Sequence, residues 1–264
     1  MKIKSIYYLP NTMNTQLINK SSNHHKYKGV LSKSVNNKIT IVSLTKDADI
    51  SSDTIRNLHG IIYHNNNPNK IIANNIPITI PSSHSISTLK LNPQLSLKCF
   101  RIREFIDGVS LRLYFNGVWH IATKRSTNAT AKYKTTTDET LNYLFKKYTE
   151  NAINYRMLNI QRTYYFIASL PEVTKSTHNT QPIIYYSHSS DNKKLNENDY
   201  TPLSEAIELK MPKEYIFNTY EEITDALTTL KMPDIGFIIH AEENLYITLE
   251  TEEYKSLSKY NTPR

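Results

Sequence analysis

The stretch FIDGVSLRLYFNGVWHIATKRS, residues 105–126, decides the fold more than any other part of the chain. Apolar side chains alternate along one face of an expected strand, at Leu111, Leu113 and Phe115. Asn116-Gly117 is a dipeptide that favours the two-residue turn of a β-hairpin. The alternation resumes after the turn, at Trp119, Ile121 and Thr123. The stretch therefore predicts an antiparallel hairpin with one face in the core.

Further strands are expected on both sides of this hairpin. Upstream, two apolar segments at 60–63 and 70–73 flank the turn-like sequence HNNNPN at 64–69. Downstream, four short apolar segments predict strands at 164–166, 183–186, 236–240 and 245–249. Residues 187–202 are polar and are expected to form a loop. Residues 11–38 are also polar and are expected to be irregular.

Two segments have the spacing of amphipathic helices. The first, within 138–150, has its apolar residues at Leu141, Leu144, Phe145 and Tyr148. The second repeats this spacing at Ile223, Ala226, Leu227 and Leu230. Asn218 or Thr219 is expected to cap the second helix, with Glu221 or Glu222 completing a capping box, and Pro233 follows its end. Helices and strands in this mixed order predict an α+β fold.

Composition excludes several classes of protein. The 264 residues include one cysteine, Cys99, so neither an intramolecular disulfide nor a cysteine-based metal site is possible. The N-terminus lacks the apolar core of a signal peptide, and no apolar run is long enough to span a membrane. These features predict a cytoplasmic protein that does not enter a membrane. The 27 Asn, 19 Tyr and only 5 Gly are typical of an AT-rich gene.

No sequence motif for a metal, a nucleotide-binding loop or a nucleophilic serine is present. His24 and His25 lie in the polar N-terminal segment, and His59 and His64 flank an expected turn. A third metal ligand is not spaced near either pair, so these residues are interpreted as ordinary histidines. We therefore expect neither a metal nor a cofactor.

Charge is distributed unevenly along the chain, although the net charge is +8. Residues 1–46 contain eight lysines and no acid, and residues 98–134 are also basic. Residues 199–253 carry thirteen acids against three lysines. A basic region suits a phosphate backbone, whereas an acidic region suits a basic protein surface. The two regions also suit solvated faces that partly neutralise each other.

The order of these segments resembles the RNA ligase branch of the covalent nucleotidyltransferases, which also include DNA ligases and mRNA capping enzymes. Besides 105–126, the resemblance rests on 59–77, 138–150, 163–172, 212–227, 234–240 and 245–257. It implies a single ligase-like domain at 39–264, with twisted antiparallel sheets, flanking helices and a central groove. A polar N-terminal segment at 1–38 precedes this domain. We expect no C-terminal accessory domain, because the chain ends soon after the last matching segment.

The resemblance also implies which reactive groups are missing. Family members attack the α-phosphate of ATP or GTP with a lysine, and here that position is Phe105. A phenyl ring cannot form the lysyl–nucleotide bond. Ile167 and Ile235 stand in place of two glutamates, the second of which contacts metal in the family. Thr248 and Glu250 stand in place of two phosphate-binding lysines. Apolar Phe105 and Ile235 are expected to narrow the groove.

Other parts of the corresponding nucleotide pocket are retained. The residues that match are Asp107, Gly108, Arg112, Lys124, Arg125 and the aromatic Tyr165. His59 stands where the family usually has arginine. Lys124 is the one nearby lysine that could replace the nucleophile, because Lys98 lies too far upstream. The sequence therefore predicts a vestigial pocket in a chain that no longer catalyses its ancestral reaction.

The leading hypothesis is a non-catalytic binding protein. AT-rich cytoplasmic elements such as yeast linear plasmids encode toxins that cut tRNA anticodon loops, together with immunity proteins against them. A ligase-like chain with an acidic surface would suit an immunity protein that blocks the basic active site of such a toxin. The partner surface is expected at Glu242, Glu243, Glu250, Glu252 and Glu253.

Three alternatives remain open on the sequence alone. The first is an RNA-binding protein that uses the basic residues of 98–134. The second is an active RNA ligase or other nucleotidyltransferase with a displaced lysine. The third is a structural subunit of a viral or plasmid assembly.

Overall fold

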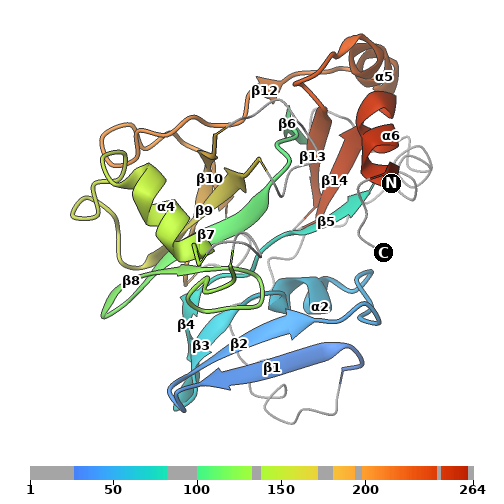
Figure 1. Cartoon of the computed structure of the whole chain (residues 1–264). Coiled ribbons are helices and arrows are strands. Elements are labelled where there is room, and N and C mark those ends of the chain that lie inside the picture. The colour runs from blue at the N-terminus through green and yellow to red at the C-terminus, as the bar shows by residue number, and fades with distance from the viewer. Residues whose placement is uncertain are drawn as a thin grey trace, which may run out of the picture.

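The architecture is α+β, with three separate sheets and four helices in the described part of the chain (Figure 1). The computed structural model describes residues 27–81, 100–132, 138–171, 181–193, 198–242 and 245–260. Every pairing between the strands is antiparallel except one, between β14 (Leu245–Glu250) and β5 (Ile78–Pro81). The expected fold class is therefore confirmed.

The first sheet is formed by the N-terminal part of the described chain. Its strands have the order β1 (Val30–Val35), β2 (Ile39–Leu44), β3 (Ile62–His64) and β4 (Asn67–Ala73). The short helix α2 (Asp53–Leu58) lies between β2 and β3 in the sequence. Apolar residues of β2, β3 and β4 form two small cores. All the pairings of this sheet join strands that follow each other in the sequence.

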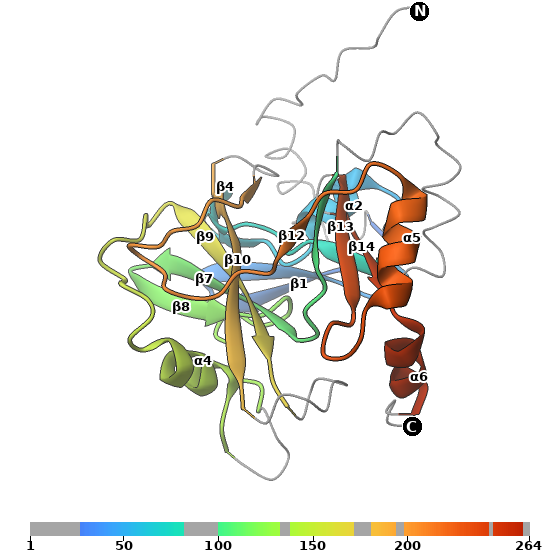
Figure 2. The same ribbon diagram turned by 90° about the horizontal axis from the view of Figure 1, so that it is seen from above.

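The second sheet contains the hairpin that was predicted within residues 105–126. Its order is β11 (Asn198–Asp199), β10 (Ile183–Asp191), β9 (Arg162–Ser169), β7 (Val109–Asn116) and β8 (Val118–Ala122). Leu113 pairs with Ile121 across the hairpin, and Gly117 has a φ of +79° at its tip. Helix α4 (Leu141–Thr149) covers one face of the sheet (Figure 2). The ring of Phe145 packs 4.9 Å from Phe166 in the largest core.

The third sheet joins segments from distant parts of the sequence. Its order is β12 (Glu214–Tyr215), β6 (Arg101–Glu104), β13 (Gly236–Glu242), β14 (Leu245–Glu250) and β5 (Ile78–Pro81). Helix α5 (Tyr220–Thr229) packs Ile223 on the apolar face of this sheet, against Phe237, Ile239 and Ile102. Helix α6 (Glu252–Tyr260) follows β14 and lies near α5 at the same outer edge (Figures 1 and 2).

The predicted cap of the second helix is confirmed. The hydroxyl of Thr219 accepts a hydrogen bond from the backbone N–H of Glu222 at 3.2 Å. The carboxylate of Glu222 in turn accepts one from the backbone N–H of Asn218 at 2.7 Å. This reciprocal pair is a capping box displaced by one residue at its second bond.

Three expectations about polar segments were wrong. Residues 187–202 are not a loop throughout, because β10 continues to Asp191 and β11 pairs with it. The segment before residue 39 is not irregular throughout, because β1 pairs along its whole length with β2. The turn expected at 64–69 is only two residues long, and β4 already begins at Asn67. In each case a largely polar segment forms backbone hydrogen bonds with a neighbouring strand, although it lacks the apolar alternation from which a strand is predicted.

No helix among the described residues is long and apolar enough to cross a membrane. The described side chains also contain no group of three His, Cys, Asp or Glu that could hold a metal ion. Cys99, His24 and His25 lie outside the described residues.

Gly236 is the glycine on which the third sheet depends most. Its φ is +147°, and a Cβ atom there would lie 1.9 Å from the carbonyl oxygen of Leu249 on β14. We expect Gly236→Ala to lower the free energy of unfolding by about 3 kcal/mol, because the substitution forces β13 and β14 apart. Gly117→Ala is the matched control, since it also has a positive φ but has open space around it, and we expect it to cost about 1 kcal/mol. Urea unfolding of both variants measures the difference, and equal losses would contradict this account.

Candidate functional site

The polar faces of the second and third sheets meet at the centre of the molecule, and we call the region between them the groove. On the second sheet, the face opposite α4 carries Arg112, Tyr165, His188 and Ser190. On the third sheet, the residues that contact this face are Arg103, His240 and Tyr246. Residues along each strand alternate between the two faces of its sheet. The apolar residues of these strands point into the two apolar cores, and the polar residues lie on the faces that meet.

One continuous stack of five rings fills the middle of this groove. Its members in order are Tyr165, His188, Tyr200, His240 and Tyr246. The two outer contacts are parallel, with centroid separations of 4.2 Å for Tyr165–His188 and 4.0 Å for His240–Tyr246. Tyr200, which follows β11, bridges the two sheets with centroids 5.0 Å from His188 and 5.1 Å from His240. We call this set the ring stack.

Hydrogen bonds and cations fix the centre of the ring stack. The Tyr200 hydroxyl lies 2.9 Å from both the Tyr246 hydroxyl and His240 Nδ1. The guanidinium groups of Arg101 and Arg103 lie 4.3 Å and 5.3 Å from the centroid of the Tyr200 ring. Burial and these two cations hold the pKa of His240 at about 3, so its ring is neutral. Burial also holds the pKa of His188 well below its usual value.

Arg112 connects the second sheet to the first. Its side chain is completely buried, and its guanidinium donates a hydrogen bond to the carbonyl oxygen of Asn74. The hydroxyl of Tyr165, its neighbour on β9, donates to the carbonyl oxygen of Asn75 at 2.8 Å. Burial lowers the pKa of Arg112 to about 10. Its Nε and Nη2 atoms have no hydrogen-bond partner among the described residues.

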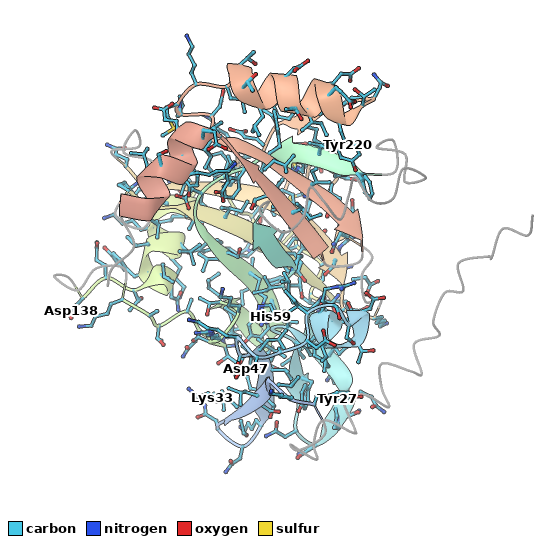
Figure 3. All side chains as sticks on the ribbon, turned by 90° about the vertical axis from the view of Figure 1, so that its right-hand side faces the viewer. Tyr27, Lys33, Asp47, His59, Asp138 and Tyr220 are labelled. Atoms are coloured by element: carbon cyan, nitrogen blue, oxygen red, sulfur yellow. The ribbon has the colours of Figure 1, made fainter. Side chains whose placement is uncertain are left out.

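Further cationic side chains lie at the end of the groove where Arg112 contacts the first sheet. Figure 3 shows His59 where the first sheet meets the rest of the molecule. Burial lowers the pKa of His59 to about 4, with further lowering by the charges of Lys124, Arg112 and Arg125. Lys124 and Arg125 are exposed on the turn after β8. This end of the groove therefore attracts anions, and His59 takes no proton at neutral pH.

At the other end of the groove lies Phe105, where the resemblance predicts the nucleophile. Phe105 follows β6, and its backbone N–H donates to the carbonyl oxygen of Gly236 at 3.0 Å. Its ring meets the edge of the Tyr254 ring, with centroids 5.9 Å apart and planes at 89°. The Tyr254 hydroxyl is hydrogen-bonded to Asp107. Burial, this bond and the nearby charges of Asp107 and Glu250 raise the pKa of Tyr254. Helix α6 thus inserts a buried phenol between Phe105 and Asp107.

The remaining residues of the predicted pocket are distributed along the groove. Gly108 lies against β9, where a Cβ atom would be 2.5 Å from the Ala168 carbonyl oxygen and 2.9 Å from Ile167. Ile235 is buried immediately before β13. Thr248 is buried on β14, two residues before the half-buried Glu250. Lys124 and Arg125 belong to the His59 end, and Phe105, Asp107 and Glu250 belong to the Tyr254 end.

The predicted partner surface is only partly described. Glu252 and Glu253 are exposed in the first turn of α6, and Glu252 forms an ion pair with Lys255 at 2.6 Å. Glu243 lies outside the described residues, and Glu242 ends β13. The structure adds three exposed acids on the neighbouring helix α5. We define the acidic helix surface as Glu221, Glu222, Asp225, Glu252 and Glu253.

Most of the residues that fill the groove were not predicted from the sequence. Of the ring stack only Tyr165 was predicted, and Tyr254 was not. His188 and Tyr200 lie within the segment interpreted as a polar loop. His240 and Tyr246 alternate with buried apolar residues on their strands, which is the pattern of a second, inward face. That alternation was the available signal.

Comparison with solved structures identifies the fold. A putative ATP-dependent DNA ligase from Aquifex aeolicus matches 94% of this chain and 67% of its own length, with a TM-score of 0.52 and 12% identity. An archaeal ATP-dependent RNA ligase matches 95% of this chain and 66% of its own length, with a TM-score of 0.52 and 10% identity. This chain thus spans about two thirds of the length of these proteins. No protein-family model and no curated protein sequence matches it. The chain has an RNA-ligase-like nucleotidyltransferase fold.

The lowered pKa values of three histidines predict a loss of stability in acid. His59, His188 and His240 stay neutral in the folded protein, whereas unfolding returns their pKa values to about 6.5. Below pH 6.5 the unfolded chain therefore binds more protons, and the folded state loses about 1.4 kcal/mol per proton and per pH unit down to about pH 4. Urea unfolding at pH 7 and pH 5 measures this loss. His240→Gln should reduce the slope by one proton, and an unchanged slope would contradict the burial of a neutral His240.

Proposed function

We propose that this chain is a non-catalytic protein of RNA-ligase-like fold that acts by binding. The observation that carries the proposal is the pairing of Phe105 with Tyr254 at the position where the family has its lysine. Neither ring can attack a phosphate in the way an amine does, and the Tyr254 hydroxyl is engaged by Asp107. Its raised pKa also keeps this phenol protonated and weakly nucleophilic at neutral pH.

The filling of the groove supports the same proposal. A nucleotide in the groove would have to displace rings that already satisfy one another by stacking and hydrogen bonding. Each aromatic pair contributes about 0.5–1.5 kcal/mol beyond the area that it buries. Displacement would also expose the buried His188 and the third-sheet residue Tyr246. The ring stack therefore opposes nucleotide binding even where cations at the His59 end favour it.

In its narrower form, we propose that the chain is an immunity protein that binds an RNA-cutting toxin, such as a tRNA anticodon nuclease, and covers its active site. The acidic helix surface supports this form, because nuclease active sites that hold RNA are basic. Helices α5 and α6 lie on the outside of the third sheet (Figure 2), and these acids are exposed on them. Binding there needs no opening of the ring stack.

One observation favours a second candidate, binding of RNA phosphates. Three cations act on His59, namely the buried Arg112 and the exposed Lys124 and Arg125. Among the described residues, no acid acts on it. An unpaired buried guanidinium is costly unless an anion or water satisfies it. Lys124 is also the residue on which an active ligase with a displaced nucleophile would depend. A structural role in a viral or plasmid assembly has no particular residue in its support.

Incubation with Mg²⁺ or Mn²⁺ and with ATP or GTP radiolabelled at the α-phosphate tests whether the first catalytic step survives. We expect no covalent nucleotide on the protein by denaturing gel and intact mass. We also expect none on Phe105→Lys, because Ile167, Ile235, Thr248 and Glu250 leave the other catalytic positions empty of their family residues. An adduct that disappears in Lys124→Ala would establish the active-ligase alternative instead.

Charge reversal tests the acidic helix surface. The partner is captured from cells that carry the gene's own genetic element. We expect the triple variant Glu221→Lys, Asp225→Lys and Glu253→Lys to weaken this capture at least tenfold. These residues are exposed, and they leave the capping carboxylate of Glu222 and the ion pair of Glu252 intact. The matched control Asp47→Lys, Glu205→Lys and Glu208→Lys changes net charge equally at other exposed positions.

The captured protein decides the narrower proposal. It should cut tRNA in vitro, and the wild-type chain should inhibit that cleavage while the triple variant does not. Equal weakening by the control variant would reduce the effect to net charge. A partner without ribonuclease activity would refute the immunity role and leave the binding role in place.

A further inference from the structure

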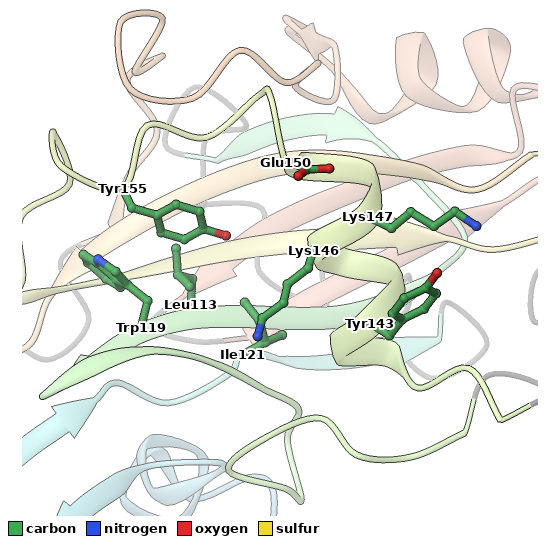
Figure 4. Close-up of a pocket in the computed structure, with 8 residues that line it drawn as sticks. All are labelled: Leu113, Trp119, Ile121, Tyr143, Lys146, Lys147, Glu150 and Tyr155. Carbon is green, nitrogen blue, oxygen red and sulfur yellow. The ribbon is translucent and has the colours of Figure 1, made fainter.

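A second cavity lies on the other side of the second sheet, between helix α4 and strand β8 (Figure 4). We call it the α4 pocket, and its volume is about 540 Å³. Its floor is formed by Leu113 and Ile121 from the β7–β8 hairpin. Arg112, between Leu113 and Leu111 on β7, points to the groove on the opposite face. The α4 pocket is therefore separate from the groove, from the ring stack and from the acidic helix surface.

We propose that the α4 pocket binds one nucleotide of a single-stranded nucleic acid. The base stacks on Trp119 and Tyr155, and the phosphate is held by Lys146 and Lys147. Aromatic stacking combined with lysine contacts to phosphate is the combination that proteins use for single strands. The proposal stands on this cavity alone and goes beyond the proposed function.

The aromatic wall is already in place. Figure 4 shows Trp119 and Tyr155 together at one end of the pocket, across from α4. Their ring centroids lie 6.3 Å apart. Trp119 is held from behind by Phe115 and Tyr164, at 5.4 Å and 6.0 Å between centroids. A ring fixed in this way loses little conformational entropy when a base stacks on it.

The lysines supply the charge that a phosphate needs. Lys146 is exposed, makes no ion pair with any described residue, and extends from α4 toward Ile121 in Figure 4. Lys147 lies 5.7 Å from the ring centroid of Tyr143 and 3.7 Å from a carboxylate oxygen of Glu139. Because Lys147 is paired with Glu139, Lys146 supplies the cation that is available to a phosphate, beside Glu150 in the lining. This charge favours a phosphate-bearing strand over an apolar peptide segment.

The volume fits the proposed occupant. Sites for small organic ligands have volumes of about 300–1,000 Å³, and a single nucleotide falls within that range. The pocket is open to solvent along the helix, and Tyr143 at its edge is 51% exposed. A longer strand can therefore enter with one base in the pocket and its neighbours outside.

Trp119 makes the test direct, because it is the only tryptophan in the sequence. We expect a short oligoadenylate to quench its fluorescence saturably, and AMP to bind more tightly than adenosine because of its phosphate. With two phosphate contacts, the logarithm of the binding constant should fall with the logarithm of salt concentration at a slope of about −1.4. The corresponding deoxyoligonucleotide distinguishes a preference for RNA from general single-strand binding.

Two variants separate the two kinds of contact. Lys146→Glu with Lys147→Glu should raise the Kd more than tenfold, and Tyr155→Leu should raise it about tenfold by removing a stacking surface. Lys33→Glu, exposed on the edge strand β1 of the first sheet, is the control and should leave the Kd unchanged. Circular dichroism confirms that each variant is folded.

Other outcomes would overturn the proposal. Absence of quenching at millimolar nucleotide and at low salt would show that the pocket takes no base. Binding that survives in the double lysine variant but is lost in Lys124→Glu with Arg125→Glu would assign the nucleic acid to the His59 end of the groove. Quenching by an apolar peptide and not by oligoadenylate would make the pocket a protein-docking site.

Discussion

The ring stack is the contact through which the second and third sheets hold each other. Its rings come from β9, β10, β13 and β14 and from the residue after β11, so that each sheet needs the other to bury its polar face. The stack requires neutral imidazoles, since a charge on His188 or His240 would meet Arg101 and Arg103. Arg112 extends the connection to the first sheet through Asn74. The second and third sheets are thus joined by polar and aromatic groups, whereas the first and second sheets also share an apolar core, in which Tyr114 and Ala122 pack against Ile41, Ile62 and Ile72.

This arrangement divides the molecule into an occupied interior and two outer surfaces of different chemistry. The groove of the fold is filled by the chain's own rings, and the position of the expected nucleophile is covered by Tyr254. Acids gather on α5 and α6, and lysines gather beside aromatic rings on α4. The two proposals use these outer surfaces, one for a basic protein and one for a nucleic acid strand. They are compatible because the surfaces belong to different sheets.

Local signals in the sequence were sufficient for helices α4 and α5 and for the central hairpin, whereas the short helices α2 and α6 were not predicted. Thr219 and Glu222 cap α5 because capping depends only on residues a few positions apart. The resemblance also identified Phe105 and Glu250 as neighbours of one site, and Tyr254 lies between them in the structure. The ring stack could not be predicted, because His188 and His240 meet only through pairings between distant strands. The extension of β10 was missed because its buried residues include Ser187, Ser189 and Ser190, whose polar side chains hide the strand in the sequence.

The parallel pairing of β14 with β5 has a consequence for how the chain folds during synthesis. Leu245 pairs with Ile78, so the third sheet joins one of the first described strands to one of the last. The first sheet and the β7–β8 hairpin can form as soon as their residues leave the ribosome, because their contacts are local. Strands β5 and β6 must wait with open edges until β13 and β14 have emerged. The nascent chain is therefore exposed to mispairing until β13 and β14 have left the ribosome, and a premature stop before β13 would leave those edges unpaired.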